Sequence, residues 1–262
     1  MRTRTPLTLS ARLAAAAAAT IAALAGCTSA PSAGGPPGEA QPAAAAGSGA
    51  HTASPGLPRQ ISQLDGSLVD AAGRGETAAV QRLLVGGASV DARDQQGRTA
   101  LIAAAYGNRL DAARALVDAG ADVNAKDDTE QSAYLIATSE VGDDVRLLEL
   151  TLAAGADVRA LDSYRGTGLI RAADRGHPQV IDRLLRAGVP VDHVNRLGWT
   201  ALLEAVILGD GSPRYARTVQ LLLDGGADPQ LADRDGTTAL AHAQARDQDA
   251  VSQLLRAAGA SD

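Results

Sequence analysis

Apolar and small residues recur at helical spacing in paired segments along most of this chain of 262 residues. In one pair, a small-residue helix follows Gly97-Arg98-Thr99-Ala100-Leu101 and runs through Tyr106, and a second apolar-periodic helix covers residues 110–117. A later pair opens in the same way at residues 198–202 and has its second helix near residues 218–223. The pattern predicts helix–turn–helix units.

A glycine followed by a small residue closes each pair, at a nearly constant period. These glycines are Gly87, Gly120, Gly155, Gly188, Gly226 and Gly259, separated by 33, 35, 33, 38 and 33 residues. A period held this closely is typical of stacked supersecondary units that bury their core between neighbours. We therefore predict an all-α solenoid of about six helix–turn–helix units.

Individual positions within the units have a physical reason. Thr99, Thr200 and Thr238 stand where a helix needs an N-cap oxygen, and the closing glycines stand where the chain must turn left-handed. Asn108 and Asp247 tolerate that conformation best among other residues. They occupy the place that glycine holds in the other units, at Gly75, Gly142, Gly176 and Gly209.

These features resemble the ankyrin-repeat family, in which Thr-Pro-Leu-His-x-Ala-Ala opens the first of two antiparallel helices. The matching stretches are residues 99–104, 167–173, 200–205 and 238–243. The proline is missing from all of them and the histidine from nearly all. The resemblance covers Ile61 to Asp262 and implies hairpin-like turns between repeats, with partner proteins bound by the hairpin tips and the exposed inner-helix face.

Some units depart from this pattern. The third has Ser132-Ala133-Tyr134 in place of Thr-Ala-Leu and two extra residues, and the fifth has about five extra residues, including Asp210-Gly211-Ser212-Pro213. We expect both insertions in the link between the two helices, and a flexible break at the third unit stays open. The terminal units are expected to act as caps, with a polar outer face on the last helix formed by Arg246, Asp247, Gln248, Asp249 and Gln253.

The N-terminus carries a separate signal. Three arginines precede an apolar run over residues 13–24, which is too short to span a bilayer and is typical of a signal-peptide core. The run ends in Leu24-Ala25-Gly26-Cys27, which resembles the lipobox of bacterial lipoproteins and implies acylation of Cys27. We divide the chain into a signal peptide (1–27), an Ala/Pro/Gly/Ser tether (28–60) and a repeat domain (61–262). An ordinary cleaved signal is the alternative.

The resemblance also bears on location. Thr28 replaces the aspartate that usually keeps such lipoproteins in the inner membrane, so we expect the periplasmic face of the outer membrane. An actinobacterial cell surface is the alternative. The tether of about 33 residues has a reach of roughly 30 Å as a flexible chain, whether its length is selected as a spacer or not.

Charge and composition exclude several classes of function. The chain has a net charge of −6, and loss of the three leader arginines leaves it near −9. Nucleic acid is therefore not expected as a partner, because it requires a basic surface. With no Phe, four Tyr and one Trp, the chain fits a core of Leu, Val and Ala better than a cofactor pocket. We expect no cofactor, no metal and a monomer.

Candidate catalytic groups are few. His177, His193 and His242 lack a Ser or Asp at triad spacing, and each fits a turn hydrogen-bonding role. A metal site at His177 and His193 was the weaker alternative. Asp233-Arg234-Asp235-Gly236 imitates a calcium loop but has Gln244 where the closing glutamate is needed. We predict that the protein is not an enzyme; one using these histidines or the Asp-rich turns is the minor alternative.

We predict partner binding at the hairpin tips. The candidate residues are Gln95, Gln96, Arg98, Asp128, Thr129, Gln131, Ser163, Tyr164, Arg165, Arg196, Leu197, Trp199, Arg234 and Asp235. Tyr164, Leu197 and Trp199, flanked by arginines, have the composition of an interface hot spot. In the alternative interpretation, Trp199 packs between repeats.

A second candidate surface is charged. It combines acidic residues of the third unit with arginines of the fourth: Asp127, Asp128, Glu130, Asp143, Asp144, Arg159, Arg165, Arg171 and Arg175. A solvated face is the simpler interpretation, and steering of a charged partner is the other.

The expected function is a lipid-anchored, extracytoplasmic scaffold that binds another protein. Resemblance to bacterial periplasmic ankyrin proteins associated with peroxide defence implies a role in envelope stress protection. Resemblance to envelope ankyrin proteins that neutralise toxins implies, as the alternative, an immunity-type inhibitor of a secreted toxin.

Overall fold

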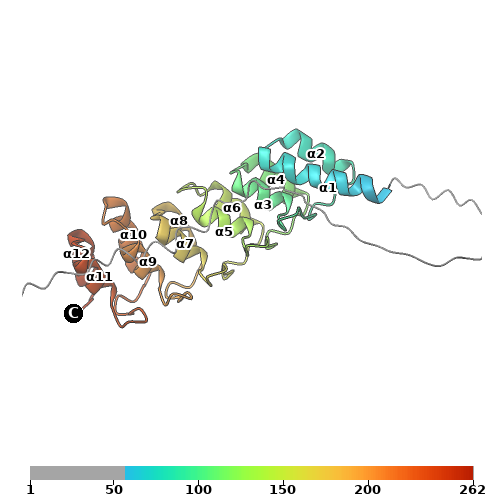
Figure 1. Cartoon of the computed structure of the whole chain (residues 1–262). Helices are drawn as coiled ribbons and strands as arrows, with labels where there is room; N and C mark the ends of the chain where they lie inside the picture. Colours follow the sequence, from blue (N-terminus) through green and yellow to red (C-terminus); the bar gives the residue numbers. More distant parts are fainter. Residues whose placement is uncertain (1–56, 262) are drawn as a thin grey trace, which may run out of the picture. The chain divides into compact units, whose positions relative to one another are not determined.

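A computed structural model describes residues 57–261 as a series of paired helices. The predicted leader, Cys27 and nearly all of the predicted tether lie outside the described residues. Figure 1 shows six pairs, which we number as repeats 1 to 6 in chain order. The helices are α1 (Leu57–Arg74), α2 (Thr77–Val85), α3 (Ala100–Tyr106), α4 (Leu110–Asp118), α5 (Ala133–Ser139), α6 (Arg146–Ala153), α7 (Gly168–Arg175), α8 (Pro178–Arg186), α9 (Ala201–Ile207), α10 (Pro213–Asp224), α11 (Ala239–Ala245) and α12 (Asp249–Ala257).

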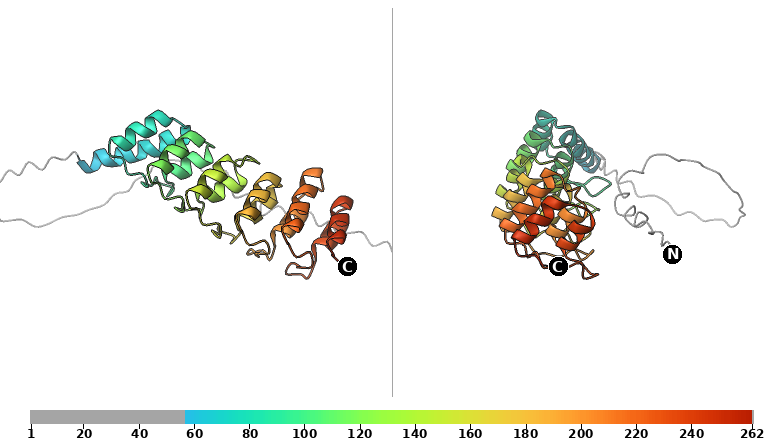
Figure 2. Two further views of the ribbon diagram at one scale, coloured as in Figure 1. Left: turned by 180° about the vertical axis from the view of Figure 1, so that it is seen from behind. Right: turned by 90° about the vertical axis from the view of Figure 1, so that its left-hand side faces the viewer.

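The pairs stack in two rows. The odd-numbered helices form an inner row in which each packs on the next, and hairpin turns beside this row join one repeat to the following one. The two views of Figure 2 show the same succession from α1 to α12. The predicted all-α solenoid is therefore confirmed for residues 57–261, where the only extended pairing is two isolated bridges, Arg93–Thr99 and Ala232–Thr238. Helix α1 begins at Leu57, four residues before the predicted domain boundary.

Hydroxyl side chains start the inner helices. Thr99, Thr200 and Thr238 each accept a hydrogen bond from the backbone N–H three residues ahead, at 3.3 Å. The predicted N-caps are thus confirmed, and Ser132 and Thr167 make the same contact in repeats 3 and 4. Ser132 therefore conserves the capping chemistry of the degenerate third repeat.

Left-handed residues end the helices as predicted, with one exception. The six closing glycines have φ between 80° and 95°, and Asn108 and Asp247 have φ of 49° and 54°. Gly209 was expected to be left-handed and is not, so this expectation is wrong. The insertion lengthens both α10 and the link between α9 and α10, and the left-handed turn falls two residues later, at Gly211 with φ 71°.

Small residues let the inner helices approach closely. Alanines dominate the buried positions of this row, including Ala104, Ala137, Ala172, Ala205 and Ala243. Leucine, isoleucine and valine fill the space between the rows, and each such fully buried side chain contributes roughly 2 kcal/mol through the hydrophobic effect. One apolar cluster extends over all six repeats, as stacked repeats require.

The third repeat has a matched partner in the fourth. Tyr134 replaces the expected leucine and is fully buried, with its hydroxyl 3.4 Å from the Val158 carbonyl oxygen. Gly168 replaces the alanine of the other repeats, and a Cβ there would lie 2.7 Å from the Tyr134 hydroxyl and 2.9 Å from Thr138 Cγ2. The glycine therefore provides the room that the larger side chain of repeat 3 needs.

A side chain at the start of an outer helix often donates a hydrogen bond to a carbonyl near the C-terminal end of the inner helix in the preceding repeat. Arg109 Nε donates to the Gly73 carbonyl at 3.3 Å, and the Tyr215 hydroxyl donates to the Asp174 carbonyl at 2.8 Å. Gln248 Nε2 donates to the carbonyls of Val206 and Gly209. Gln248 was expected on the polar outer face of the last helix; it is buried instead, because it completes the end of α9. The other four residues of that predicted face are exposed.

The insertion of repeat 3 lies in the link between its two helices, as predicted, whereas that of repeat 5 is divided between the link and α10, which has 12 residues. Asp143, in the link of repeat 3, accepts hydrogen bonds from Gln179 N at 2.8 Å and Val180 N at 3.1 Å. These are the free N–H groups of the first turn of α8, so the inserted link caps a helix of repeat 4.

A chain of hydrogen bonds, which we call the turn ladder, connects the turns that follow successive outer helices. Asp91 accepts from Asp122 N at 2.9 Å, Asn124 from Asp157 N at 2.8 Å and Asp192 from Asp228 N at 3.1 Å. Between the last two repeats, Gln230 Nε2 donates to the Gly259 carbonyl at 3.0 Å.

The turn ladder is interrupted between repeats 3 and 4. Arg159 stands where an acceptor is needed, and Pro190, which has no N–H, stands where a donor is needed. The outer helices α6 and α8 also scarcely touch, whereas the other neighbouring outer helices pack on one another. The weakly matched third repeat therefore meets repeat 4 at a joint that lacks both the turn-ladder hydrogen bond and close packing of the outer helices.

No helix between residues 57 and 261 combines the length and the apolar character needed to cross a bilayer.

Candidate functional site

Each hairpin turn is built around one side chain. The oxygen of this side chain accepts hydrogen bonds from the backbone N–H groups two and four residues ahead, at 2.8–3.0 Å. The residues are Asp94, Asp127, Asp162, Asn195 and Asp233. These Asx turns fix the backbone of the tips before any partner binds. Asp233 therefore belongs to an inter-repeat turn.

Two tips hold a non-glycine residue in a left-handed conformation. Gly97, Gly198 and Gly236 take this conformation in repeats 2, 5 and 6. Glu130 and Arg165 occupy the equivalent place in repeats 3 and 4, with φ of 62° and 58°. A residue with a Cβ costs roughly 1–2 kcal/mol there, so these two tips carry exposed charges at a conformational cost.

A second side chain supports three of the turns from nine residues ahead, on the inner helix. Arg171 Nη1 donates to Asp162 Oδ2 at 3.0 Å, and His242 Nε2 lies 2.8 Å from Asp233 Oδ2. In repeat 5 the polarity is reversed, because Asn195 Nδ2 donates to Glu204 Oε1 at 2.7 Å. A neutral Asn in the turn avoids the repulsion that an aspartate would meet beside Glu204.

Glu204 was missed by sequence reasoning. It is 5% exposed, and burial raises its pKa to about 8, with the nearby carboxylate of Asp174 adding to the effect. The Asn195 hydrogen bond opposes the shift. The recurring nine-residue spacing of the pairs Asp162/Arg171 and Asp233/His242 could have indicated the pair Asn195/Glu204.

Most of the predicted tip residues are exposed. They are Gln95, Gln96, Asp128, Thr129, Tyr164, Arg165, Arg196, Leu197, Arg234 and Asp235. Arg98, Gln131, Ser163 and Trp199 are partly buried, and Arg98 forms an ion pair with Asp94 at 2.7 Å. Trp199 packs against the core cluster. Its part in binding stays a prediction.

Three exposed apolar side chains come from the tips of repeats 4 and 5. Tyr164, Val194 and Leu197 are 54%, 50% and 40% exposed. Arg196 N donates to the Tyr164 carbonyl at 2.9 Å, which ties the two tips together. We call these three residues, with Arg165, Arg196 and Arg234 around them, the tip patch. Val194 was not among the predicted residues, because it precedes the turn.

The charged surface predicted between repeats 3 and 4 is largely part of the fold. Asp127 is buried in its turn, Asp143 caps α8, and Asp144 pairs with Arg146 at 2.6 Å. Arg171 Nη2 donates to Ser139 Oγ at 2.7 Å, and Arg175 lies near Asp174 and Glu140. Asp128, Glu130, Arg159 and Arg165 are the members that are exposed without such an ion pair.

The three histidines have separate structural contacts. His177 is buried at the start of α8, where burial lowers its pKa. His193 Nε2 lies 2.7 Å from the Arg165 carbonyl, in the next joint. Within residues 57–261, no group of three or more His, Cys, Asp or Glu side chains has the arrangement of a metal site. The hydrogen bonds of His177 and His193 involve different residues, the Thr138 and Arg165 backbones.

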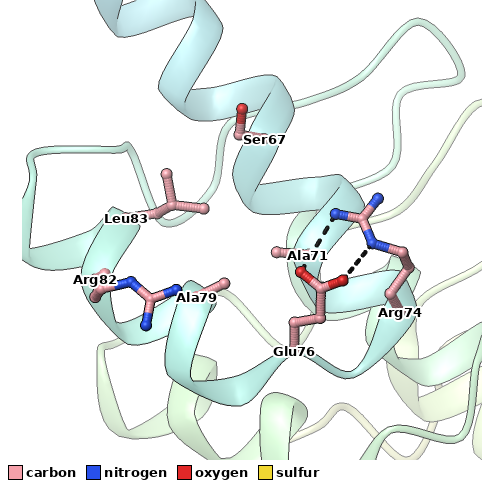
Figure 3. A pocket seen from close by; sticks show the side chains of 7 residues that line it. All are labelled: Ser67, Ala71, Arg74, Glu76, Ala79, Arg82 and Leu83. Carbon is pink, nitrogen blue, oxygen red and sulfur yellow. Dashed lines mark hydrogen bonds and ion pairs between the residues drawn. The ribbon is translucent and has the colours of Figure 1, made fainter.

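A shallow hollow of about 300 Å³ lies between α1 and α2 (Figure 3). Ser67, Ala71, Ala79 and Leu83 line it, and Arg74 Nε donates to Glu76 Oε1 at 2.7 Å at its edge. Arg74 and Glu76 are both more than one-third exposed. An exposed surface ion pair of this kind contributes little to stability.

Comparisons with known proteins agree with this architecture. A family model described as ankyrin repeats (3 copies) matches residues 65–127, 134–233 and 169–262. A relative named for its ankyrin repeats, YahD of Escherichia coli (strain K12), is 37% identical over 201 residues, covering 76% of this chain and 99% of YahD. Human mitochondrial disaggregase is 42% identical over 71 residues, but this match covers only 27% of the chain and 9% of that protein.

A solved structure extends the comparison. The crystal structure of an ankyrin repeat domain from Acinetobacter baumannii AYE has a TM-score of 0.71 and 46% sequence identity, and the match covers 74% of this chain and 98% of that domain. Ankyrin repeats are generally non-enzymatic scaffolds for protein binding, and the matches indicate no catalytic family. The chain belongs to the ankyrin-repeat family.

Proposed function

We propose that this protein is a lipid-anchored, extracytoplasmic ankyrin-repeat scaffold that binds another protein through the hairpin tips of repeats 4 and 5. The observation that carries the binding proposal is the tip patch. Its three apolar side chains are exposed on turns whose backbone is already fixed by hydrogen bonds. A preorganised surface with Tyr and Arg side chains is typical of interface hot spots.

Capture from envelope extract tests this proposal. The full chain is compared with a Tyr164→Ala/Leu197→Ala variant and with a control, Val85→Ala/Leu208→Ala, which removes exposed apolar side chains away from the tips. We expect one protein to be retained by the parent and the control and lost by the tip variant. Equal retention by all three would remove the tips of repeats 4 and 5 from the proposed site.

The anchor is a separate part of the proposal and is supported by residues 1–27. We expect the mature chain to begin at Cys27 and to carry acyl chains there. Two or more such chains are needed for stable anchoring. Mass spectrometry of the N-terminal peptide, with Cys27→Ser as control, checks this. A mature chain that begins at another residue and carries no lipid would favour the ordinary cleaved signal. Thr28 supports the periplasmic face of the outer membrane, which fractionation tests.

For the biological process, we propose envelope stress protection, with neutralisation of a secreted toxin as the alternative. A deletion strain that is sensitive to peroxide but unaffected by competing bacteria would support the first role. The opposite pair of phenotypes would support the second.

A further inference from the structure

The tips of repeats 4, 5 and 6 present arginines that lack acidic partners. Arg165, Arg196 and Arg234 are all exposed, and none forms an ion pair with another residue between 57 and 261. Arg234 instead donates to the Arg196 carbonyl, so its side chain lies across the fifth tip. This local positive charge stands out in a chain whose net charge is negative.

The neighbouring carboxylates face the fold. Asp162 is held by its turn and by Arg171, and Asp233 is held by its turn and by His242. Asp192 accepts the turn-ladder hydrogen bond from Asp228 N. Of the acidic residues in these three hairpins, Asp235 is the one exposed at a tip. The three arginines therefore have few intramolecular carboxylates to satisfy them.

The tips of repeats 2 and 3 have a different character. They present Gln95, Gln96, Asp128, Thr129 and Glu130, without an exposed large apolar side chain. Apolar exposure and unpaired positive charge thus coincide only at the C-terminal half of the tip row in the described chain.

Arg165 has a left-handed backbone conformation that residues other than glycine disfavour. Its φ of 58° is one that glycine adopts at three other tips. A long cationic side chain is therefore carried beside Tyr164 where glycine would serve the turn better.

We propose that the tip patch binds an acidic segment of a partner protein that carries an aliphatic or aromatic side chain. This inference rests on the proposed protein-binding function. The apolar side chain of the partner packs on Tyr164, Val194 and Leu197, and its carboxylates pair with the guanidinium groups of Arg165, Arg196 and Arg234. Complementary charges of this kind accelerate association and make it sensitive to salt.

Selection from a displayed library of random peptides of about twelve residues tests the partner chemistry. The full chain is the bait, and the enriched peptides are then measured against two variants with the same change of charge. Arg165→Glu/Arg196→Glu reverses the tip patch, and Arg114→Glu/Arg217→Glu reverses exposed arginines on α4 and α10. We expect enriched peptides that combine Asp or Glu with an apolar residue. Their binding should fall at least about tenfold with the tip reversal, and by less than about twofold with the control.

Other outcomes would overturn the inference in distinct ways. Enrichment of neutral or basic peptides that still lose binding in Tyr164→Ala/Leu197→Ala would overturn the acidic partner while supporting the proposed binding at the tips. Enriched peptides that bind all variants equally, or no enrichment, would count against both. Self-association that sedimentation detects and the tip reversal abolishes would identify a second copy as the occupant.

Discussion

At the joint between repeats 3 and 4 one position of the inner helix holds a basic side chain, and at the next joint the same position holds a buried acid with a raised pKa. Between repeats 3 and 4, Arg171 reaches from α7 to the Leu135 carbonyl, Ser139 Oγ and Glu140 of the preceding repeat. Between repeats 4 and 5, the equivalent position of α9 holds the buried acid Glu204, near Asp174 of α7. The hairpin residue changes with it, from Asp162 to Asn195.

This difference indicates that the hairpin residue and the inner-helix residue are matched to each other within each repeat. The residue nine positions after the hairpin residue can be basic or acidic, provided that the hairpin residue can form the complementary hydrogen bond with it. The joint between repeats 3 and 4 depends more on this arginine, because it lacks both the turn-ladder bond and close packing of α6 on α8.

The largest expected effect follows from removing the cation. Arg171→Ala should lower the free energy of unfolding by about 3–5 kcal/mol, because Asp162 is left buried without its partner. Denaturant unfolding followed by circular dichroism measures this. Addition of Asp162→Asn, which reproduces the hairpin residue of repeat 5, should recover part of the loss. Arg186→Ala, which removes an exposed ion pair on α8, should change little; an equal loss there would contradict the argument.

The buried acid gives the second effect, which depends on pH. The folded pKa of about 8 for Glu204 lies above its ordinary value of 4.5. Its contribution to stability is therefore full below about pH 4.5 and is lost as the pH rises through about 8. Glu204→Gln should remove this loss and be more stable than the parent by roughly 4 kcal/mol near pH 8. Thermal unfolding of both proteins between about pH 5 and pH 9 measures it, and parallel curves would refute the shift.

The matched pair at the joint of repeats 3 and 4 gives the third effect. Gly168→Ala should cost about 1–3 kcal/mol, because the new methyl group meets the buried Tyr134 hydroxyl. The same substitution in a Tyr134→Leu background should cost much less, since leucine restores the room found in the other repeats. A double-mutant cycle measures the coupling. Additive costs would show that the two residues do not depend on each other.

The inserted link gives a smaller effect. Asp143→Ala should cost about 1 kcal/mol, because two N–H groups at the start of α8 lose their acceptor. Hydrogen exchange should become faster at Gln179 and Val180. Asp144→Ala is the control, since its carboxylate pairs only with the exposed Arg146 among the described residues. Equal effects on α8 from both variants would argue against the capping role.

The smallest expected effect comes from rebuilding the missing turn-ladder bond. Arg159→Asn with Pro190→Asp introduces the acceptor and donor found at the other joints, and should contribute at most about 1 kcal/mol, reduced by the loss of proline rigidity. The readout is protection of the new backbone N–H at position 190 from hydrogen exchange. The single variant Pro190→Asp should leave that N–H unprotected, and equal exchange in both would mean that the bond does not form.

Features that repeat along the chain were predictable, because each follows from local backbone chemistry. The N-caps at Thr99, Thr200 and Thr238 and the left-handed closing glycines are confirmed for this reason. The prediction of a left-handed Gly209 was wrong, because the insertion changes which residue makes the turn. The structural role of Asp143 was not predicted, because its contacts join different repeats, about which local spacing says little. The pair Asn195/Glu204 lies within one repeat, and its signal, a nine-residue spacing shared with two other pairs, was missed. The tip residues were found by position, yet only the structure separates the exposed Tyr164 from the packed Trp199.

The contacts that outer helices make with the preceding repeat bear on modularity. Because Arg109, Tyr215 and Gln248 complete the inner helices of repeats 1, 4 and 5, part of each of these repeats is encoded by the segment that follows it. If one period between two closing glycines were deleted, the inner helix of the preceding repeat would lose the side chain that completes its end. The repeat that then follows would bring a side chain that does not match this helix end. The transferable cassette of this protein is therefore longer than its sequence period, and must include the start of the following outer helix.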